Sequence, residues 1–203
     1  MRTMKTVDGE AFQTALLASY EKDSALLRLG RLLKDKGWAL LGSAGTAKFL
    51  NEKGIPCKDV AEKVGPPILG HRVVTLSREI HAGLLASTKE DFEELKRLGI
   101  EPIDLVYVTL YPLEKTLSDA ATTEDEVIQQ TDIGGPTLLR SAAKGRRIVL
   151  SNPSQIDALE QWLSRGAPEE EKKNMIARFA ADAERRVANY VDASASYWEK
   201  KVQ

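Results

Sequence analysis

The chain has 203 residues, 42% hydrophobic and 29% charged, which is ordinary for a globular protein. Its net charge of −1 argues against a nucleic-acid or membrane surface, and a single cysteine excludes an internal disulfide and a cysteine-based metal cluster. Two histidines argue against a histidine-rich metal site. Because neither an apolar signal core nor an apolar run of membrane-spanning length is present, a cytoplasmic protein is expected.

Short apolar runs and helical periodicity alternate along the chain and predict strands separated by helices. The strands are expected over residues 14–18, 38–41, 57–60, 104–110 and 147–150. The helices are expected from a cap at Asp23 or Ser24 to Gly37, then over 47–53, 89–97, 122–130, within 131–144, and over 152–165 and 168–199.

This alternation forms βαβ units, whose strands lie parallel. The predicted fold class is therefore α/β, with three layers and a central, mainly parallel sheet of about five strands. Residues 1–166 are expected to form this α/β domain, and 167–203 a C-terminal helical appendage. Residues 61–71 are rich in glycine and proline and predict a loop that lies over the site.

A loop of small residues, Gly42-Ser43-Ala44-Gly45-Thr46, separates the second strand from its helix. Such a loop exposes backbone N–H groups at a helix N-terminus, where the helix dipole favours an anion. Ser43 and Thr46 could add hydroxyl donors. The alternative is that the loop only reverses the chain, as Gly-Ser turns do in many α/β proteins.

The segment 131–144 combines a Gly134-Gly135-Pro136 turn with a short amphipathic helix. Asp132 precedes the turn, and Lys144 ends the helix, where a cation suits the dipole. The spacing alone favours a structural interpretation, in which Asp132 caps a turn and Lys144 is a solvated helix end.

Four motifs, in order along the chain, resemble those of IMP cyclohydrolase, the N-terminal, methylglyoxal-synthase-like domain of the bifunctional enzyme that ends purine biosynthesis. Residues 131–144 are similar to its D-I-G-G-x-x-L-L-R-A-A-A-K element, and residues 42–46 to its S-x-G-G-T-A-K loop. Residues 72–85 are similar to R-V-K-T-L-H-P-K-I-H-x-G-I-L, and Tyr111-Pro112 to N-L-Y-P-F. The resemblance covers about residues 15–161, most of the chain.

This resemblance implies ring closure of a formylated aminoimidazole carboxamide ribotide to IMP with loss of water. The implied partners are this nucleotide and its product, and no metal or other cofactor is needed. Ser43, Gly45 and Thr46 would hold the 5′-phosphate. Lys22 would assist them, since it stands where the family's S-V-S-D-K motif has its Lys.

The resemblance also implies roles in the chemistry. Lys144 would supply positive charge for the oxyanion, and Asp132 would orient the attacking amide or accept its proton. Tyr111 would hydrogen-bond the formyl or carboxamide group, and Arg72 would position the substrate.

The chain departs from the family at Val74, where the family has Lys, and at Ser77-Arg78-Glu79, where it has His-Pro-Lys. Losing one preorganised donor costs about 2.7–4 kcal/mol of barrier, and Arg78 is the candidate to replace the charge. Val74, together with Ala18 and Tyr20 in place of the two serines of the S-V-S-D-K motif, favours a rival function, a non-catalytic purine-nucleotide-binding or regulatory module. The retained Tyr111, Asp132 and Lys144 argue against it, because binding alone would not need all three. A second rival is a methylglyoxal-synthase-like phosphate lyase. The oligomeric state stays open, with a homodimer among the alternatives.

Overall fold

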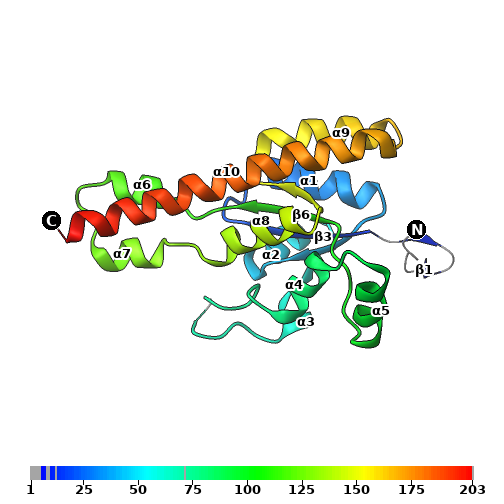
Figure 1. Ribbon diagram of the computed structural model, residues 1–203, viewed down its shortest axis with the longest axis horizontal. Coiled ribbons are helices and arrows are strands. Elements are labelled where there is room, and N and C mark those ends of the chain that lie inside the picture. The colour runs from blue at the N-terminus through cyan, green and yellow to red at the C-terminus, as the bar shows by residue number, and fades with distance from the viewer. Residues whose placement is uncertain (1–5, 8–9, 12, 71, 203) are drawn as a thin grey trace.

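The computed structural model describes residues 6–7, 10–11, 13–70 and 72–202 and has a five-stranded, all-parallel sheet at its centre (Figure 1). Its strands are β3 (Thr14–Ser19), β4 (Ala39–Gly42), β5 (Lys58–Asp59), β6 (Leu105–Thr109) and β7 (Ile148–Leu150), in the order β5-β4-β3-β6-β7. A separate antiparallel pair joins β1 (Thr6–Val7) to β2 (Glu10–Ala11). The predicted α/β class, with its parallel sheet of about five strands, is confirmed.

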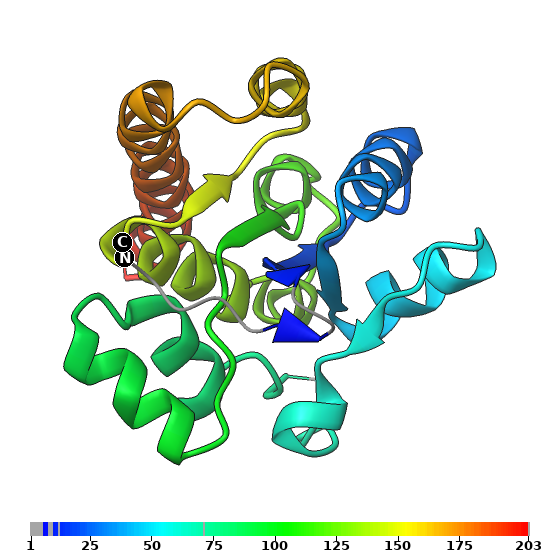
Figure 2. The same cartoon turned by 90° about the vertical axis from the view of Figure 1, so that its right-hand side faces the viewer.

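Helices lie on both sides of this sheet (Figure 2). They are α1 (Ser24–Asp35), α2 (Ala44–Glu52), α3 (Ala61–Val64), α4 (Arg78–Leu85), α5 (Lys89–Arg97), α6 (Leu113–Ser118), α7 (Glu124–Gln129), α8 (Gly134–Lys144), α9 (Ile156–Ser164) and α10 (Glu169–Lys201). A 3₁₀ turn, η1 (Pro153–Gln155), precedes α9. Helices α1 and α2 pack against the β4 half of the sheet, whereas α8 packs against β6 and β7.

The central strands are continuously apolar because both of their faces are covered. In β3 and β6, Leu16 pairs with Val106 in register, and both are fully buried. This is the pattern of parallel sheets sandwiched between helices, whose strands lack the polar alternation of half-exposed strands. The strongest predicted strands are therefore the innermost ones.

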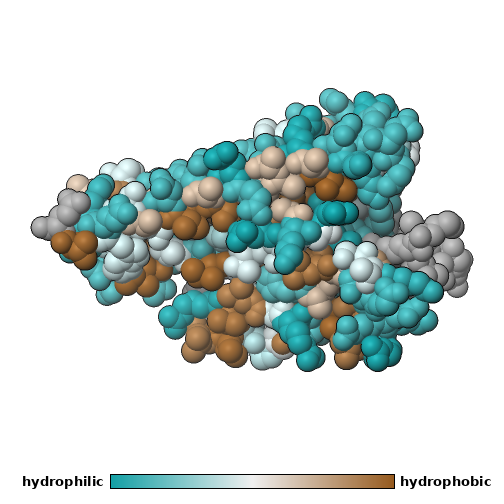
Figure 3. Space-filling view, viewed as in Figure 1, coloured by the Kyte–Doolittle hydropathy of each residue, from teal (hydrophilic) through white to brown (hydrophobic). Residues whose placement is uncertain are grey.

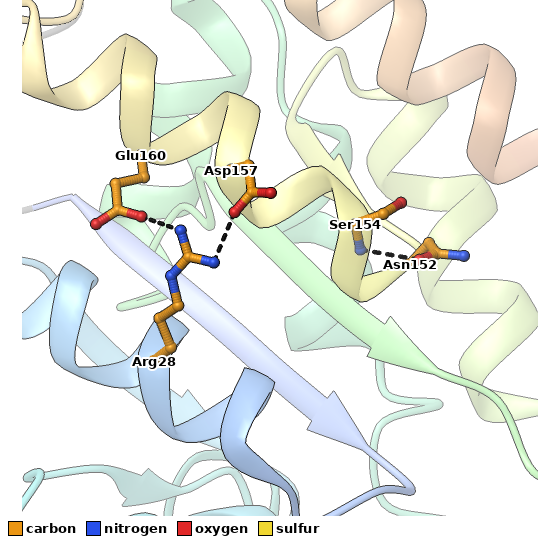
Figure 4. A network of polar contacts seen from close by, with 5 residues as sticks. All are labelled: Arg28, Asn152, Ser154, Asp157 and Glu160. Carbon is orange, nitrogen blue, oxygen red and sulfur yellow. Dashed lines mark hydrogen bonds and ion pairs between the residues drawn. The ribbon is translucent and has the colours of Figure 1, made fainter.

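Side-chain contacts join the helices that flank the sheet. Arg28 of α1 binds Asp157 and Glu160 of α9, and Asn152 caps the turn that leads into α9 through the Ser154 N–H (Figure 4). These ion pairs are half-exposed, so they orient α1 and α9 more than they stabilise them.

Helix α10 shares the core of the α/β domain. Its buried residues belong to the same hydrophobic cluster as the sheet and are Met175, Phe179, Ala183, Val187 and Tyr190. The helix runs along α8 and β7 and continues to α6 and α7 (Figure 1). The long C-terminal helix is thus confirmed, while the domain boundary at 166/167 stays a prediction.

Local differences from the sequence prediction lie in the connections. Helix α2 begins at Ala44, three residues earlier than expected, so residues 44–46 form its first turn. Helix α3 lies inside the predicted 61–71 loop, and α6 was not predicted. Among the described residues, none of the helices is long and apolar enough to cross a membrane.

Candidate functional site

A cavity of about 680 Å³ lies at the carboxyl ends of β3, β4 and β6. Its lining comes from residues 18–20, 22, 43–45, 108, 109 and 111 around those strand ends, from 128, 129 and 131–135 around the link between α7 and α8, from Pro67, Arg72, Val74 and Thr75, and from Trp198 of α10. From β3 the chain adds β4 and then β5 on one side of the sheet, and later adds β6 and β7 on the other side of β3. The strand order therefore reverses at β3. A site beside this reversal of strand order is the usual ligand position in an open parallel sheet.

One end of the cavity is the N-terminus of α2. Strand β4 ends at Gly42, and Ser43, Ala44 and Gly45 line the cavity as the helix begins. In the described part of the chain, no side chain caps this helix, since the Ser43 hydroxyl instead donates to Thr46 Oγ1 at 3.1 Å. The first-turn amides therefore offer the anion site that the sequence predicts.

The Lys22 ammonium lies beside this helix start. Its Nζ donates hydrogen bonds to the Ser19 carbonyl and, at 3.1 Å, to the Tyr20 carbonyl. Its Cε is so near Gly45 that a Cβ there would lie 3.3 Å away. Burial lowers the pKa of Lys22, while Glu21 acts in the opposite direction. An anion bound at α2 would compensate for this burial, because opposite charges favour the ionised form.

Thr46 has a different environment from its neighbours. The residue is fully buried, and its Oγ1 accepts a hydrogen bond from the Ser19 N–H at 3.1 Å. The hydroxyl joins the end of β3 to the first turn of α2 and is not part of the cavity wall. Its position fits a structural role better than the predicted phosphate contact.

The other end of the cavity contains the partly buried carboxyl group of Asp132. Its Oδ1 accepts a hydrogen bond from the Gly135 N–H at 2.9 Å. Burial raises the pKa of Asp132, and the backbone amides of Gly135, Tyr111 and Gly134 oppose that shift. The carboxyl group thus caps the start of α8, as the structural interpretation expected, and also faces the cavity.

The Gly134-Gly135 pair is required by close approach. A Cβ on Gly135 would collide with the Asp132 carboxyl group and would lie 2.7 Å from Leu110 Cδ2. A Cβ on Gly134 would lie 2.9 Å from Thr75 Oγ1. Only glycine lets the carboxyl group fold against the helix start, since contacts this short are not formed by real side chains.

Tyr111 lies next to Asp132 at the end of β6. Burial raises the pKa of its hydroxyl group, and electrostatic interactions with Asp132 and with Tyr20 raise this pKa further. The rings of Tyr20 and Tyr111 are tilted by 55° with centroids 5.2 Å apart. The Tyr111 hydroxyl therefore stays protonated near neutral pH and can donate a hydrogen bond into the cavity.

Arg72 and Val74 line the wall between these ends. The Arg72 Nε donates to the Leu69 carbonyl at 2.9 Å, which fixes the base of its guanidinium. The apolar Pro67, Val74 and Ile133 also line the cavity. The neighbouring Ile68 and Leu69 are exposed, and Figure 3 shows that brown, hydrophobic patches interrupt the mainly hydrophilic surface of this face of the molecule. The wall thus presents one guanidinium in an apolar setting.

Two predicted site residues lie away from the cavity. Helix α8 starts at the cavity, and Lys144 is its eleventh and last residue. Lys144 is exposed, and its backbone lies about 15 Å along the helix axis from the start of α8. The Arg78 side chain is 79% exposed and pairs with Glu79 at 3.3 Å. The structure therefore brings together Lys22, Ser43, Gly45, Arg72, Tyr111 and Asp132, and does not bring Thr46, Arg78 or Lys144 to the cavity wall.

Sequence reasoning expected a loop at 61–71 over the site and a contact from Arg72, but it missed the contributions of Thr75 and of Trp198 in α10. Trp198 lines the cavity from the far end of α10, and Thr75 lies against Gly134. An aromatic residue near the end of an amphipathic helix carries no signal for such a contact. The described residues contain no group of three or more His, Cys, Asp or Glu side chains that could hold a metal ion.

An all-parallel sheet with a site at its strand-order reversal defines an α/β ligand-binding or catalytic domain. A family model described as the MGS-like domain matches residues 25–137, more than half of the chain, and the protein belongs to that family.

The curated relatives carry the name bifunctional purine biosynthesis protein PurH. The protein of that name from Natranaerobius thermophilus is 41% identical over 189 residues, covering 91% of this chain and 36% of the relative. That from Synechococcus sp. strain WH7803 is 44% identical over 193 residues, with the same coverage. The chain thus spans about a third of the length of these relatives.

A solved structure titled ForH is similar over nearly its whole length. It superimposes with a TM-score of 0.74 at 29% identity, covering 92% of this chain and 98% of the ForH chain. Because the match covers 92% of this chain, it includes most of α10 together with the sheet.

Proposed function

We propose that this protein closes the purine ring of IMP from a formylated aminoimidazole carboxamide ribotide, with loss of water. One observation carries this proposal: a single cavity has an uncapped helix start with Lys22 at one end and the partly buried Asp132 beside Tyr111 at the other. The name of the PurH relatives supports a role in purine biosynthesis. A cytoplasmic location and a homodimer stay predictions.

The phosphate of the nucleotide would bind at α2. The first-turn amides, the Ser43 hydroxyl and the Lys22 ammonium would contact its oxygens. Thr46 would act indirectly, by fixing the position of this turn against β3. This end supplies binding and orientation, which lower the barrier by holding the two reacting groups of one substrate in contact.

The ring-closing step would take place beside Asp132 and Tyr111. The carboxamide nitrogen forms a bond to the formyl carbon and passes a proton to the Asp132 carboxylate, while the carbonyl electron pair moves to oxygen. Returning that proton to the oxygen gives a hydroxyl group. The hydroxyl group then leaves as water with the proton of the former formamide N–H, and the electron pair of that N–H bond forms the ring C=N bond. Burial of Asp132 favours this role, because a raised pKa brings a carboxylate closer to the ideal for a general base.

The oxyanion of this step would be stabilised by Tyr111 and Arg72. Lys144 and Arg78 both lie too far from the cavity wall to contact the oxyanion, and Val74 has no charge. Arg72 is the cation on the cavity wall next to Val74, and its guanidinium keeps donors beyond the Nε that binds Leu69. The charge lost at Val74 is thus assigned to a neighbour within the site.

The proposal is tested by following the absorbance change when the formylated ribotide is added to the purified protein. Turnover is expected, together with binding of IMP detectable by calorimetry. Lys22→Met should weaken IMP binding about tenfold or more, since it removes a charge-assisted contact. Lys48→Met is the control, because Lys48 is an exposed residue of α2, the helix at which the phosphate is proposed to bind, and does not line the cavity. Equal losses in both variants would contradict the phosphate assignment.

A non-catalytic nucleotide-binding module is the second candidate function. Val74 in place of the family's Lys, and the exposed positions of Lys144 and Arg78, favour it. It predicts IMP binding without ring closure, even in a Val74→Lys variant. Ring closure by the wild type, or a gain of tenfold or more in Val74→Lys, would exclude this candidate.

A further inference from the structure

The hydroxyl group of Tyr190 holds the backbone on both sides of residue 131. It accepts a hydrogen bond from the Asp132 N–H at 2.8 Å and donates one to the Gln130 carbonyl at 2.9 Å. Tyr190 belongs to α10, nearly sixty positions later in the chain, and is 4% exposed. A single side chain of the C-terminal helix thus fixes the link between α7 and α8.

This link needs an external partner because it has no regular structure of its own. Helix α7 ends at Gln129, and α8 begins at Gly134. A buried backbone N–H and C=O must each find a hydrogen-bond partner, and here one hydroxyl serves both. Burial raises the pKa of Tyr190 to about 12, so the hydroxyl keeps its proton and can donate at any working pH.

We propose that Tyr190 is a positioning residue for Asp132, so that α10 is part of the functional site. This inference rests on the proposed function, in which Asp132 moves the proton. The carboxyl group is fixed from one side by the amide of Gly135, and its backbone is fixed from the other side by Tyr190. The same helix contributes Trp198 to the cavity about two turns further on.

The substitution Tyr190→Phe removes the hydroxyl and keeps the ring in the core. We expect kcat to fall about tenfold to a hundredfold, because a displacement of a catalytic group by about 1 Å can cost that much. KM should change little, since the phosphate end is untouched. The acidic limb of the pH–kcat profile should move to lower pH, as Asp132 relaxes toward water and loses the effect of burial.

Tyr197→Phe is the matched control on the same helix. Tyr197 is half-buried, contacts the Trp198 ring and lies near Lys201, whereas the hydroxyl group that bonds Gln130 and Asp132 belongs to Tyr190. It should leave kcat and the pH profile unchanged. A merely structural role for Tyr190 would instead lower the melting temperature in Tyr190→Phe with kcat and the pH profile of the folded protein unchanged, and that result would overturn the proposal.

A double-mutant cycle separates an effect through Asp132 from an effect elsewhere. If Tyr190 acts through Asp132, then adding Tyr190→Phe to Asp132→Asn should cause no further loss of kcat. Losses that simply multiply would show that Tyr190 acts independently of the carboxyl group, which would contradict the proposal.

Amide hydrogen exchange keeps the test independent of catalysis. In Tyr190→Phe, exchange at the Asp132 amide should accelerate about tenfold, the equivalent of one hydrogen bond, while the rest of α8 and α10 stays protected. This result would support the positioning role even if the wild type did not close the ring. Unchanged exchange at residue 132, or a uniform rise across both helices, would overturn it.

Discussion

At the scale of single residues, Asp132 combines two opposing influences. Removal from water disfavours its charge, whereas the backbone amides around it favour the charge, and burial is the stronger of the two. A capping carboxylate at an exposed helix start would have a lowered pKa, as Asp91 of α5 has. Asp132 differs because partial removal of its carboxyl group from water outweighs the hydrogen bonds, and this difference is what suits it to accept a proton.

The raised pKa of Asp132 predicts how stability depends on pH. The folded state binds the proton of this carboxyl group more tightly than the unfolded chain does, in which the pKa of an Asp is near 3.8. The wild type should therefore lose unfolding free energy relative to Asp132→Asn as pH rises from about 4 through the raised pKa. Denaturant unfolding of both proteins from pH 4 to 8 measures this difference, and a difference independent of pH would contradict it.

Thr46 offers a second prediction at this scale. Thr46→Val keeps the shape but leaves the buried Ser19 N–H without the partner it has at 3.1 Å. The free energy of unfolding should fall by about 1–3 kcal/mol, measured by denaturant titration. Thr46→Ser retains the hydroxyl and is the control that should lose less. An unchanged stability together with lost IMP binding would instead restore the predicted phosphate contact for Thr46.

At the scale of elements, the strands and long helices follow from the sequence, and the short connections do not. A continuous apolar run such as 104–110 predicts a strand with both faces buried, as in a parallel sheet that is covered by helices on both sides. Helix α6 could not be found, because its six residues show too little periodicity to distinguish them from a loop. The predicted start of α2 is three residues too late, because a glycine such as Gly45 is typical of turns, whereas here it lies in the first turn of the helix.

Helix α10 gives the element-scale prediction. Phe179 is 1% exposed within the shared core, so Phe179→Ala should cost about 3–5 kcal/mol of unfolding free energy in a single transition. Arg28→Ala, which breaks exposed ion pairs with α9, is the control and should change stability little. Two separate transitions in the Phe179→Ala variant would show that α10 is an independent appendage.

At the scale of the whole molecule, the position of the site was predictable and its composition only in part. Residues that follow parallel strands meet at one edge of the sheet, which is why Ser43 and Tyr111 lie together, and Asp132 joins them at the start of α8, the helix that leads back to β7. Lys144 lies at the exposed end of α8 and not on the cavity wall, because a sequence motif does not show which of its side chains face the same cavity. Tyr190 and Trp198 were missed because their partners lie far away in the chain.

The most direct test of the central claim compares ring closure by the wild type, Asp132→Asn and Lys144→Ala in one absorbance assay. If the cavity beside Asp132 carries the chemistry, Asp132→Asn should lower kcat by roughly a hundredfold or more, the usual contribution of a general base. Lys144→Ala should stay within about threefold of the wild type, because its side chain lies at the exposed end of α8. Loss of turnover in Lys144→Ala with full activity in Asp132→Asn would contradict the claim.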